Sequence, residues 1–174
     1  MTPEKPLPDI VAPGLSVVFC GLNPGLSAAA SGHHFVGRSN RFWRVLHLAG
    51  FTPVQIDAEQ DASLLGYGLG ITSVVERPTA GVDDLARAEF VAAAAGFEAW
   101  VRRHAPRYVA FLGKAAYEAM MDRRSVAWGR QAEPFGGAVA WVLPNPSGRN
   151  LAFSQDALVA AYRDLRLAIE RQGD

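Results

Sequence analysis

The sequence predicts an α/β fold, specifically a three-layer α/β/α sandwich with a mostly parallel central sheet. Four short apolar segments alternate with segments of helical pattern along the chain. Strands that read as continuous apolar runs are buried on both faces, which is typical of parallel strands covered by helices. With 174 residues, 49% of them hydrophobic, the chain has the length and composition of one domain with its own core.

The first predicted strand covers residues 16–21 and contains Cys20, which is expected to be buried. Residues 1–12 are proline-rich and are predicted to form a mobile tail, so that a single domain occupies residues 13–174. Residues 26–39 are small and polar and are predicted to form a surface loop. Asn40 is expected to cap a helix over residues 41–49, because asparagine is a favoured N-cap residue.

The remaining segments continue the alternation of strands and helices. They are predicted as a strand over 70–75, a helix over 84–103, a strand over 108–113, a helix over 114–121, a strand over 138–143 and a helix over 155–171.

Composition and charge exclude several classes of protein. The 17 basic residues balance the 17 acidic residues, so a binder that relies on bulk positive charge is excluded and any contact with nucleic acid must use a local patch. The single cysteine excludes an internal disulfide and a cysteine-rich zinc site. The sequence has neither a membrane-spanning apolar run nor a signal core, so an intracellular location in the cytoplasm or nucleoid is expected.

Two asparagine-bearing loops follow predicted strands. Residues 21–25 read GLNPG after the first strand, and residues 144–150 read PNPSGRN after the fourth. Either Asn-Pro pair alone is an ordinary turn. Ligands of open parallel sheets bind beyond the carboxyl ends of the strands, so the two loops together indicate a polar site that contains Asn23 and Asn145.

The order of several motifs resembles the mismatch-specific uracil and thymine DNA glycosylases, a branch of the uracil-DNA glycosylase superfamily. The motifs are GLNPGLS (21–27), GHHF (32–35), NRFW (40–43), GIT (70–72), ERPT (76–79) and VLPNPSGR (142–149). The resemblance extends from about residue 10 to residue 162. It implies an enzyme of the same fold that flips a mispaired base out of the duplex, because the glycosidic bond is inaccessible inside the stack.

The implied activity is hydrolysis of the N-glycosidic bond of uracil, with thymine or modified cytosine as further substrates, opposite guanine in base excision repair. The enzyme is expected to be monofunctional, because the motifs contain no lysine that could form a Schiff base. Its expected partner is double-stranded DNA with G·U or G·T mispairs. It is expected to act as a monomer, away from membranes, and without a cofactor or metal.

The resemblance also implies roles for individual residues around the base. Asn23 is expected to hold the attacking water, and backbone amides or Asn145 to donate to the departing base. Phe35 is expected to stack on the flipped pyrimidine, with a core aromatic as the alternative. Gly25 is expected to leave room where stricter uracil enzymes carry a tyrosine, although it could be only a turn residue. The base-binding set is Leu22, Gly25, Ser27 and Phe35.

A second group of residues is expected to contact the DNA. In the family, the position that matches Arg149 carries leucine or arginine and fills the gap left by the extruded nucleotide. Gly148 would let the backbone approach the DNA, and Asn150 could bond the orphan guanine. The full set is Ser147, Gly148, Arg149 and Asn150, with Arg38, Arg41 and Lys114 as phosphate contacts or, alternatively, solvated surface charges.

Further polar residues allow different interpretations. Asp83 and Asp84 are expected to cap the helix over residues 84–103, and alternatively one of them could reach the pocket and assist water activation. His33 and His34 lack partners at metal-ligand spacing and are expected to lie in a polar loop near DNA. Two other functions stay open from the sequence: a non-catalytic sensor of mismatched or abasic DNA, and a nucleotide-binding α/β enzyme, which the absence of a glycine-rich fingerprint disfavours.

Overall fold

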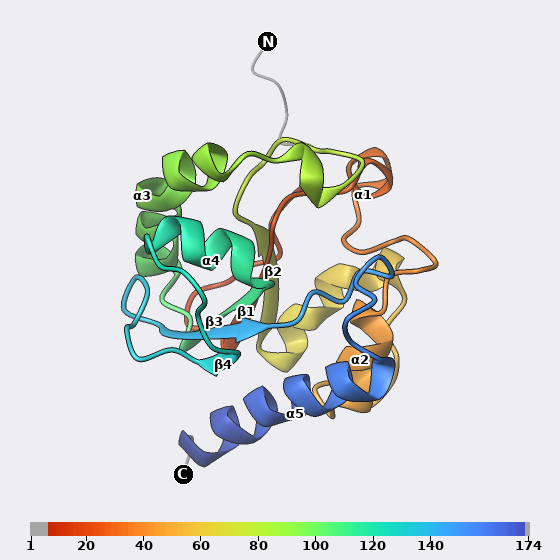
Figure 1. Cartoon of the computed structure of the whole chain (residues 1–174). Helices are drawn as coiled ribbons and strands as arrows, with labels where there is room; N and C mark the ends of the chain where they lie inside the picture. The colour runs from red at the N-terminus through yellow and green to blue at the C-terminus, as the bar shows by residue number, and fades with distance from the viewer. Residues whose placement is uncertain (1–6, 173–174) are drawn as a thin grey trace.

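The computed structural model describes residues 7–172 and has the three layers that the sequence predicts (Figure 1). The central sheet has the strand order β2-β1-β3-β5-β4. Its four longer strands are parallel, and the short β4 pairs antiparallel with β5. The strands are β1 (Val17–Gly21), β2 (Leu69–Ser73), β3 (Tyr108–Leu112), β4 (Gly129–Arg130) and β5 (Val139–Leu143).

Helices cover both faces of this sheet (Figure 1). Helices α2 and α5 lie on one face, and α3 and α4 lie on the other. The helical elements are α1 (Leu26–Ser31), α2 (Phe42–Leu48), the 3-10 segments η1 (Ala58–Tyr67) and η2 (Val82–Asp84), α3 (Arg87–His104), α4 (Lys114–Met120) and α5 (Gln155–Gln172).

Two hydrophobic cores separate the layers, and strand β1 contributes to both. Val17 and Phe19 belong to the core under α2 and α5, whereas Val18 and Cys20 belong to the core under α3 and α4. This division follows from the alternation of side chains along a strand. The expected burial of Cys20 is confirmed, and burial raises the pKa of its thiol well above the usual value.

The N-terminal boundary of the domain differs from the prediction. Residues 1–6 of the predicted tail lie outside the described residues. Leu7 and Ile10 are buried, and Ile10 forms an antiparallel bridge with Ile71 of β2. The packed domain therefore includes residues that the sequence analysis assigned to the tail, because Ile10 pairs with the edge strand β2 and Leu7 is buried as well.

Four further elements differ from the prediction. The segment predicted as a loop over 26–39 begins with helix α1, where the alanine run 28–30 favours a helix. Segment η1 and strand β4 were not predicted, because short 3-10 and two-residue elements have no periodicity to detect. Helix α3 begins at Arg87 rather than at residue 84 because Glu89, not an aspartate, accepts the hydrogen bond from the Ala86 N–H at the helix start.

Candidate active site

The two asparagine-bearing loops lie at the same edge of the sheet. Asn23 follows β1 and Asn145 follows β5, and both strands are parallel to β3, which lies between them. Two strand spacings place the loops about 10 Å apart, a distance that a pyrimidine base can bridge. Gly113 follows β3 between them and brings no side chain into this space. The site therefore lies at the carboxyl edge, where the chain crosses from one side of β1 to the other.

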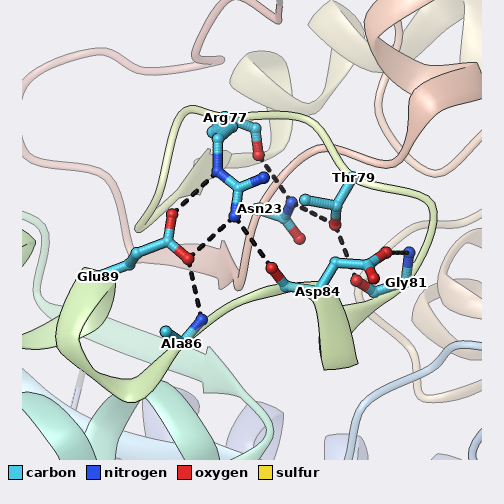
Figure 2. Close-up of polar contacts among 7 residues, drawn as sticks. All are labelled: Asn23, Arg77, Thr79, Gly81, Asp84, Ala86 and Glu89. Atoms are coloured by element: carbon cyan, nitrogen blue, oxygen red, sulfur yellow. Dashed lines mark hydrogen bonds and ion pairs between the residues drawn. The ribbon is translucent and has the colours of Figure 1, made fainter.

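The orientation of the Asn23 amide follows from its partners. Its Nδ2 donates to the carbonyl oxygen of Arg77 at 2.7 Å and to the hydroxyl oxygen of Thr79 at 2.8 Å (Figure 2). A carbonyl oxygen can only accept, so the nitrogen of the amide must face Arg77 and the oxygen must face away. No hydrogen bond to Asn23 Oδ1 is present among residues 7–172. Half-buried Asn23 therefore presents a fixed acceptor.

Asn145 has the opposite orientation. Its Oδ1 accepts from the backbone N–H of Ser147 at 2.8 Å, and its backbone oxygen accepts from Nδ2 of Asn150 at 2.9 Å. The backbone N–H of Ser147 can only donate, so the amide oxygen of Asn145 is used within the turn and its nitrogen points elsewhere. Within the described part of the chain, Nδ2 of Asn145 has no hydrogen-bond acceptor. The site thus contains one oriented acceptor and one oriented donor.

Phe35 lies beside the first of these loops, at the border of the core under α2 and α5. Its ring is half-buried and packs against Phe42 with a centroid distance of 4.3 Å. Its Cζ atom would lie 3.8 Å from a Cβ atom placed on Gly21, at the end of β1. Its φ angle of 56° is an unusual backbone conformation for a bulky residue, and the contact with Phe42 holds the ring in this position.

The other predicted base-binding residues differ in accessibility. Gly25 and Ser27 are exposed, and a Cβ atom on Gly25 would meet nothing within 4 Å. Gly25 has a φ angle of −70°, so its backbone does not require glycine. Leu22 is buried in the core under α3 and α4, so its side chain cannot contact a bound base and only its backbone is near the site.

Loop 144–153 is held in place by Arg41, which directly precedes α2 in the same layer as α5. The Arg41 guanidinium donates to the carbonyl oxygens of Phe153 at 2.8 Å and of Ser147 and Asn150 at 3.0 Å each, with a longer bond to Pro146. All three nitrogen atoms of the guanidinium donate to carbonyl oxygens of the protein. The sequence-based interpretation of Arg41 as a phosphate contact is therefore wrong. Arg41 fixes the shape of the loop instead.

A buried tyrosine fixes the start of the same loop. The hydroxyl of Tyr162 in α5 donates to the carbonyl oxygen of Pro144 at 3.1 Å. Its ring is fully buried, and burial raises the pKa of the hydroxyl, which therefore stays protonated and able to donate.

The tip of loop 144–153 meets two other loops. A Cβ atom on Gly148 would lie 2.6 Å from the backbone oxygen of Ser39, so the space beside Gly148 is occupied by Ser39 and is not left for DNA. The side chain of exposed Arg149 lies over Gly81. Its Nη1 atom would be 2.5 Å from a Cβ atom placed on Gly81. The site loops are thus in mutual contact.

Leu151 is a strongly exposed apolar residue that the sequence did not single out. Its side chain is 91% exposed, two residues after Arg149 and between the carbonyls of Asn150 and Phe153 that Arg41 holds. Leu151 lies in a loop, where no helical or strand periodicity of the sequence could have identified it. Its exposure on an immobilised backbone marks it as a candidate DNA contact beside Arg149.

Lys114 and Arg38 are the remaining predicted DNA contacts. Lys114 lies 4.5 Å above the ring of half-exposed Trp128, which packs against Phe153. Its ammonium is therefore engaged in a cation–π contact near the end of loop 144–153. Arg38 is exposed in the segment before Ser39.

The acidic residues after β2 have local roles. Asp84 accepts from the backbone N–H of Gly81 at 3.1 Å, and its own carbonyl oxygen accepts from Arg77 at 3.0 Å. It shapes loop 76–81 and does not cap α3, so the capping prediction is wrong. Asp83 is exposed in the same 3-10 turn. Neither aspartate has a hydrogen bond to Asn23 among the described residues.

The two histidines belong to an anchored turn. Asp61, buried in η1, accepts from the backbone N–H of His34 at 2.9 Å and lies 3.3 Å from Nδ1 of His33. His34 Nε2 donates to the carbonyl oxygen of Pro8 at 2.8 Å, since a carbonyl can only accept. Asp61 therefore holds the turn that leads into Phe35. This role could not be predicted, because Asp61 lies in a segment without a helical or strand pattern.

A separate groove of about 530 Å³ lies between the edge strand β2 and helix α3. Thr72, Phe97 and Trp100 line it, and Glu76 and Glu89 lie at its polar end. Neither asparagine lines this groove, so it is distinct from the candidate active site.

No helix within residues 7–172 has the length and hydrophobicity that a bilayer crossing requires. The same residues contain no group of three or more histidine, cysteine, aspartate or glutamate side chains arranged to hold a metal ion.

Comparison with known proteins defines the class to which this fold and site belong. The sequence pattern of the Uracil DNA glycosylase superfamily matches residues 8–166, nearly the whole chain. The chain therefore belongs to the uracil DNA glycosylase superfamily, whose members are DNA glycosylases that hydrolyse N-glycosyl bonds.

A solved structure supports the same architecture. It is the solution NMR structure of a protein from Methanosarcina acetivorans described as a candidate uracil DNA glycosylase. The two chains are 20% identical and superpose with a TM-score of 0.59 over 92% of this chain and 96% of the other. At this identity the likeness establishes the fold, and the predicted α/β/α sandwich is confirmed.

Proposed function

We propose that this protein is a monofunctional glycosylase that removes uracil mispaired with guanine from double-stranded DNA, as a monomer and without a cofactor. The observation that carries the proposal is the pair of oriented amides at one sheet edge, an acceptor on Asn23 and a donor on Asn145. Hydrolysis of a glycosidic bond needs both, because water must be held on one side of the sugar carbon while negative charge leaves with the base on the other.

The Asn23 oxygen would position the attacking water. It accepts a hydrogen bond from the water, whose oxygen then bonds to C1′ of the deoxyribose as the bond from C1′ to the base breaks. An amide cannot accept the proton, so the water loses it to solvent after the attack. The transition state therefore has oxocarbenium character, and Asn23 contributes by orientation and through its dipole.

The Asn145 nitrogen would stabilise the leaving base. The electron pair of the broken bond stays on the pyrimidine, and its carbonyl oxygens become stronger hydrogen-bond acceptors as the bond breaks. A donor that is already oriented at that position stabilises the transition state more than the ground state. Phe35, fixed next to the Asn23 loop, is suited to stack on the ring of the base.

Loop 144–153 would supply the DNA contact that keeps the base extrahelical. Arg149 can fill the gap in the stack and reach phosphates, and Leu151 can enter it as an apolar wedge. The protein extrudes mispaired uracil or thymine more easily than a paired base, because less pairing energy is lost. The open space beside Gly25 supports thymine and modified cytosines as additional substrates.

The proposal is tested with a panel of duplexes that carry G·U, G·T, A·U or a single modified cytosine. The protein is incubated with each duplex, and alkali then cleaves the strand wherever a base has been lost. We expect strand breaks at G·U, slower breakage at G·T and none without alkali. Tight binding to mismatched duplexes without base release on any of them would contradict the proposal and support a non-catalytic sensor.

A further inference from the structure

Arg77 contacts the Asn23 loop and helix α3 at the same time (Figure 2). Its backbone oxygen accepts from Asn23 Nδ2 at 2.7 Å. Its guanidinium makes a two-pronged ion pair with Glu89, with Nε 2.9 Å from Oε1 and Nη2 3.0 Å from Oε2, and also donates to the carbonyl oxygen of Asp84 at 3.0 Å. One residue thus connects the amide of Asn23 to the start of α3.

This ion pair lies at the surface, where such pairs usually contribute little to stability. The Arg77 side chain is 53% exposed and that of Glu89 is 30% exposed. The pair is nevertheless held in one geometry, because a planar guanidinium facing a carboxylate through two parallel bonds fixes orientation as well as distance. The bond to Asp84 fixes it at a third point, so the peptide that carries the Arg77 carbonyl has little freedom to rotate.

Glu89 has a second role that must be separated from the first. Its Oε2 atom also accepts from the backbone N–H of Ala86, which supports the first turn of α3. The hydrogen bond from Arg77, followed by that from Ala86, lowers the pKa of Glu89, so the carboxylate stays charged at neutral pH. Removing Glu89 would weaken both the helix start and the ion pair, whereas removing the Arg77 side chain leaves the bond from Ala86 to Glu89 intact.

We infer that Arg77, held by Glu89, is a positioning residue that directs the Asn23 amide so that its oxygen faces the sugar. This inference rests on the proposed glycosylase function and assigns a new residue to that site. The Arg77 side chain does not touch the substrate; it acts through its own backbone carbonyl. Loss of the side chain frees loop 76–81, lets the Asn23 amide rotate and misplaces the attacking water.

The test compares single-turnover base release from a G·U duplex, at saturating protein, for wild type, Arg77→Ala and Arg102→Ala. Arg102 is the matched control, because it forms an exposed ion pair with Glu98 in the same helix at 2.8 Å, away from Asn23. Misplacement of a reacting group by about 1 Å can cost roughly a hundredfold in rate, so we expect Arg77→Ala to slow release by about 10- to 100-fold. Affinity for the duplex should change less than threefold, and Arg102→Ala should match wild type in both measurements.

A spectroscopic measurement tests the positioning independently of activity. The side-chain amide signals of Asn23 in a 1H–15N spectrum are assigned by their disappearance in Asn23→Ala. In wild type they should be sharp and slow to exchange with solvent, and in Arg77→Ala they should broaden or exchange faster. Arg77→Lys, which keeps the charge but not the paired geometry, should recover only part of the rate.

The outcomes distinguish this inference from the function on which it rests. If wild type releases uracil and Asn23→Ala does not, but Arg77→Ala matches wild type in rate and amide exchange, the positioning role is wrong and the glycosylase proposal stands. If rate and affinity fall together in both arginine variants, the ion pair is only a surface or stability feature. If wild type releases no base, the catalytic inference fails together with the proposed function.

Discussion

Gly148 packs against Ser39 so closely that no side chain fits between them. A Cβ atom on Gly148 would lie 2.6 Å from both Cβ and the backbone oxygen of Ser39. This contact joins loop 144–153 to the segment that carries Phe35, so the residues proposed to contact the base and the DNA are held as one unit.

Gly148→Ala should separate these two loops. The added methyl group meets backbone that cannot move aside without displacing the loop, so we expect the free energy of unfolding to fall by about 1–3 kcal/mol. Affinity for a mismatched duplex should fall as well. Chemical denaturation and DNA titration measure the two effects.

Gly96→Ala is the control, because Gly96 is exposed in α3 and its Cβ atom would meet nothing within 4 Å. It should gain about 0.5–1 kcal/mol in stability, since glycine is unfavourable inside a helix. Equal effects of the two substitutions would contradict the close contact.

Arg41→Lys should loosen loop 144–153 although the charge is kept. A lysine cannot reach the three carbonyl oxygens that the guanidinium bonds at 2.8–3.0 Å. We expect the free energy of unfolding to fall by about 2–3 kcal/mol, because hydrogen bonds from charged donors are lost. Arg44→Lys, at an exposed position of helix α2, which Arg41 directly precedes, should change stability by less than about 0.5 kcal/mol. Similar unfolding midpoints for both variants would argue against the loop-fixing role.

Leu151→Ala should weaken DNA binding without changing stability. The side chain is 91% exposed and has almost no packing to lose, so the unfolding midpoint should stay constant. Affinity for a duplex with an abasic site should fall roughly tenfold, because an apolar wedge no longer enters the gap in the stack. Val54→Ala removes another exposed apolar side chain, 58% exposed, and should leave affinity unchanged. A wild-type affinity for Leu151→Ala, together with a loss for Arg149→Ala, would assign the wedge to Arg149 alone.

The sheet could be predicted because its strands are short apolar runs separated by turn residues. The strand around Phe19 and the strand around Ala110 were found within a few residues of their ends. The prediction of a loop over residues 26–39 was wrong at its start, where helix α1 lies. The alanines at 28–30 are small residues that occur in loops as well as in helices. Local composition does not decide between the two; the packing of Ala28 against the domain does.

The placement of Asn23 and Asn145 at one edge of the sheet could be predicted, but the contacts that orient their side chains could not. Asn23 and Asn145 were identifiable because each follows a strand of one parallel sheet. The partners that orient them were not, because Arg77 and Thr79 are 54 and 56 residues away from Asn23 in the sequence and reach it only through the fold. Arg41 was mistaken for a DNA contact for the same reason, since its acceptors lie more than 100 residues along the chain.

Gly25→Tyr should narrow the substrate range. The φ angle of −70° suits any residue and the surrounding space is open, so the variant should fold normally. A tyrosine ring beside the pocket would meet the methyl group of thymine but not the hydrogen of uracil. We expect thymine release from G·T to fall at least tenfold relative to uracil release from G·U, with Gly25→Ala retaining both; one methylene in a pocket discriminates roughly 10- to 200-fold. Uracil and thymine rates that fall by the same factor would place the ring outside the pocket.

The central claim is that the oxygen of the Asn23 amide orients the water that replaces the base. Single-turnover release of uracil from a G·U duplex, compared between wild type, Asn23→Ala and the exposed-amide control Gln55→Ala, tests it most directly. We expect Asn23→Ala to lose roughly 10- to 1000-fold in rate while its affinity for the duplex is kept, as for other oriented groups in active sites, and Gln55→Ala to match wild type. An Asn23→Ala rate equal to that of wild type would contradict the account.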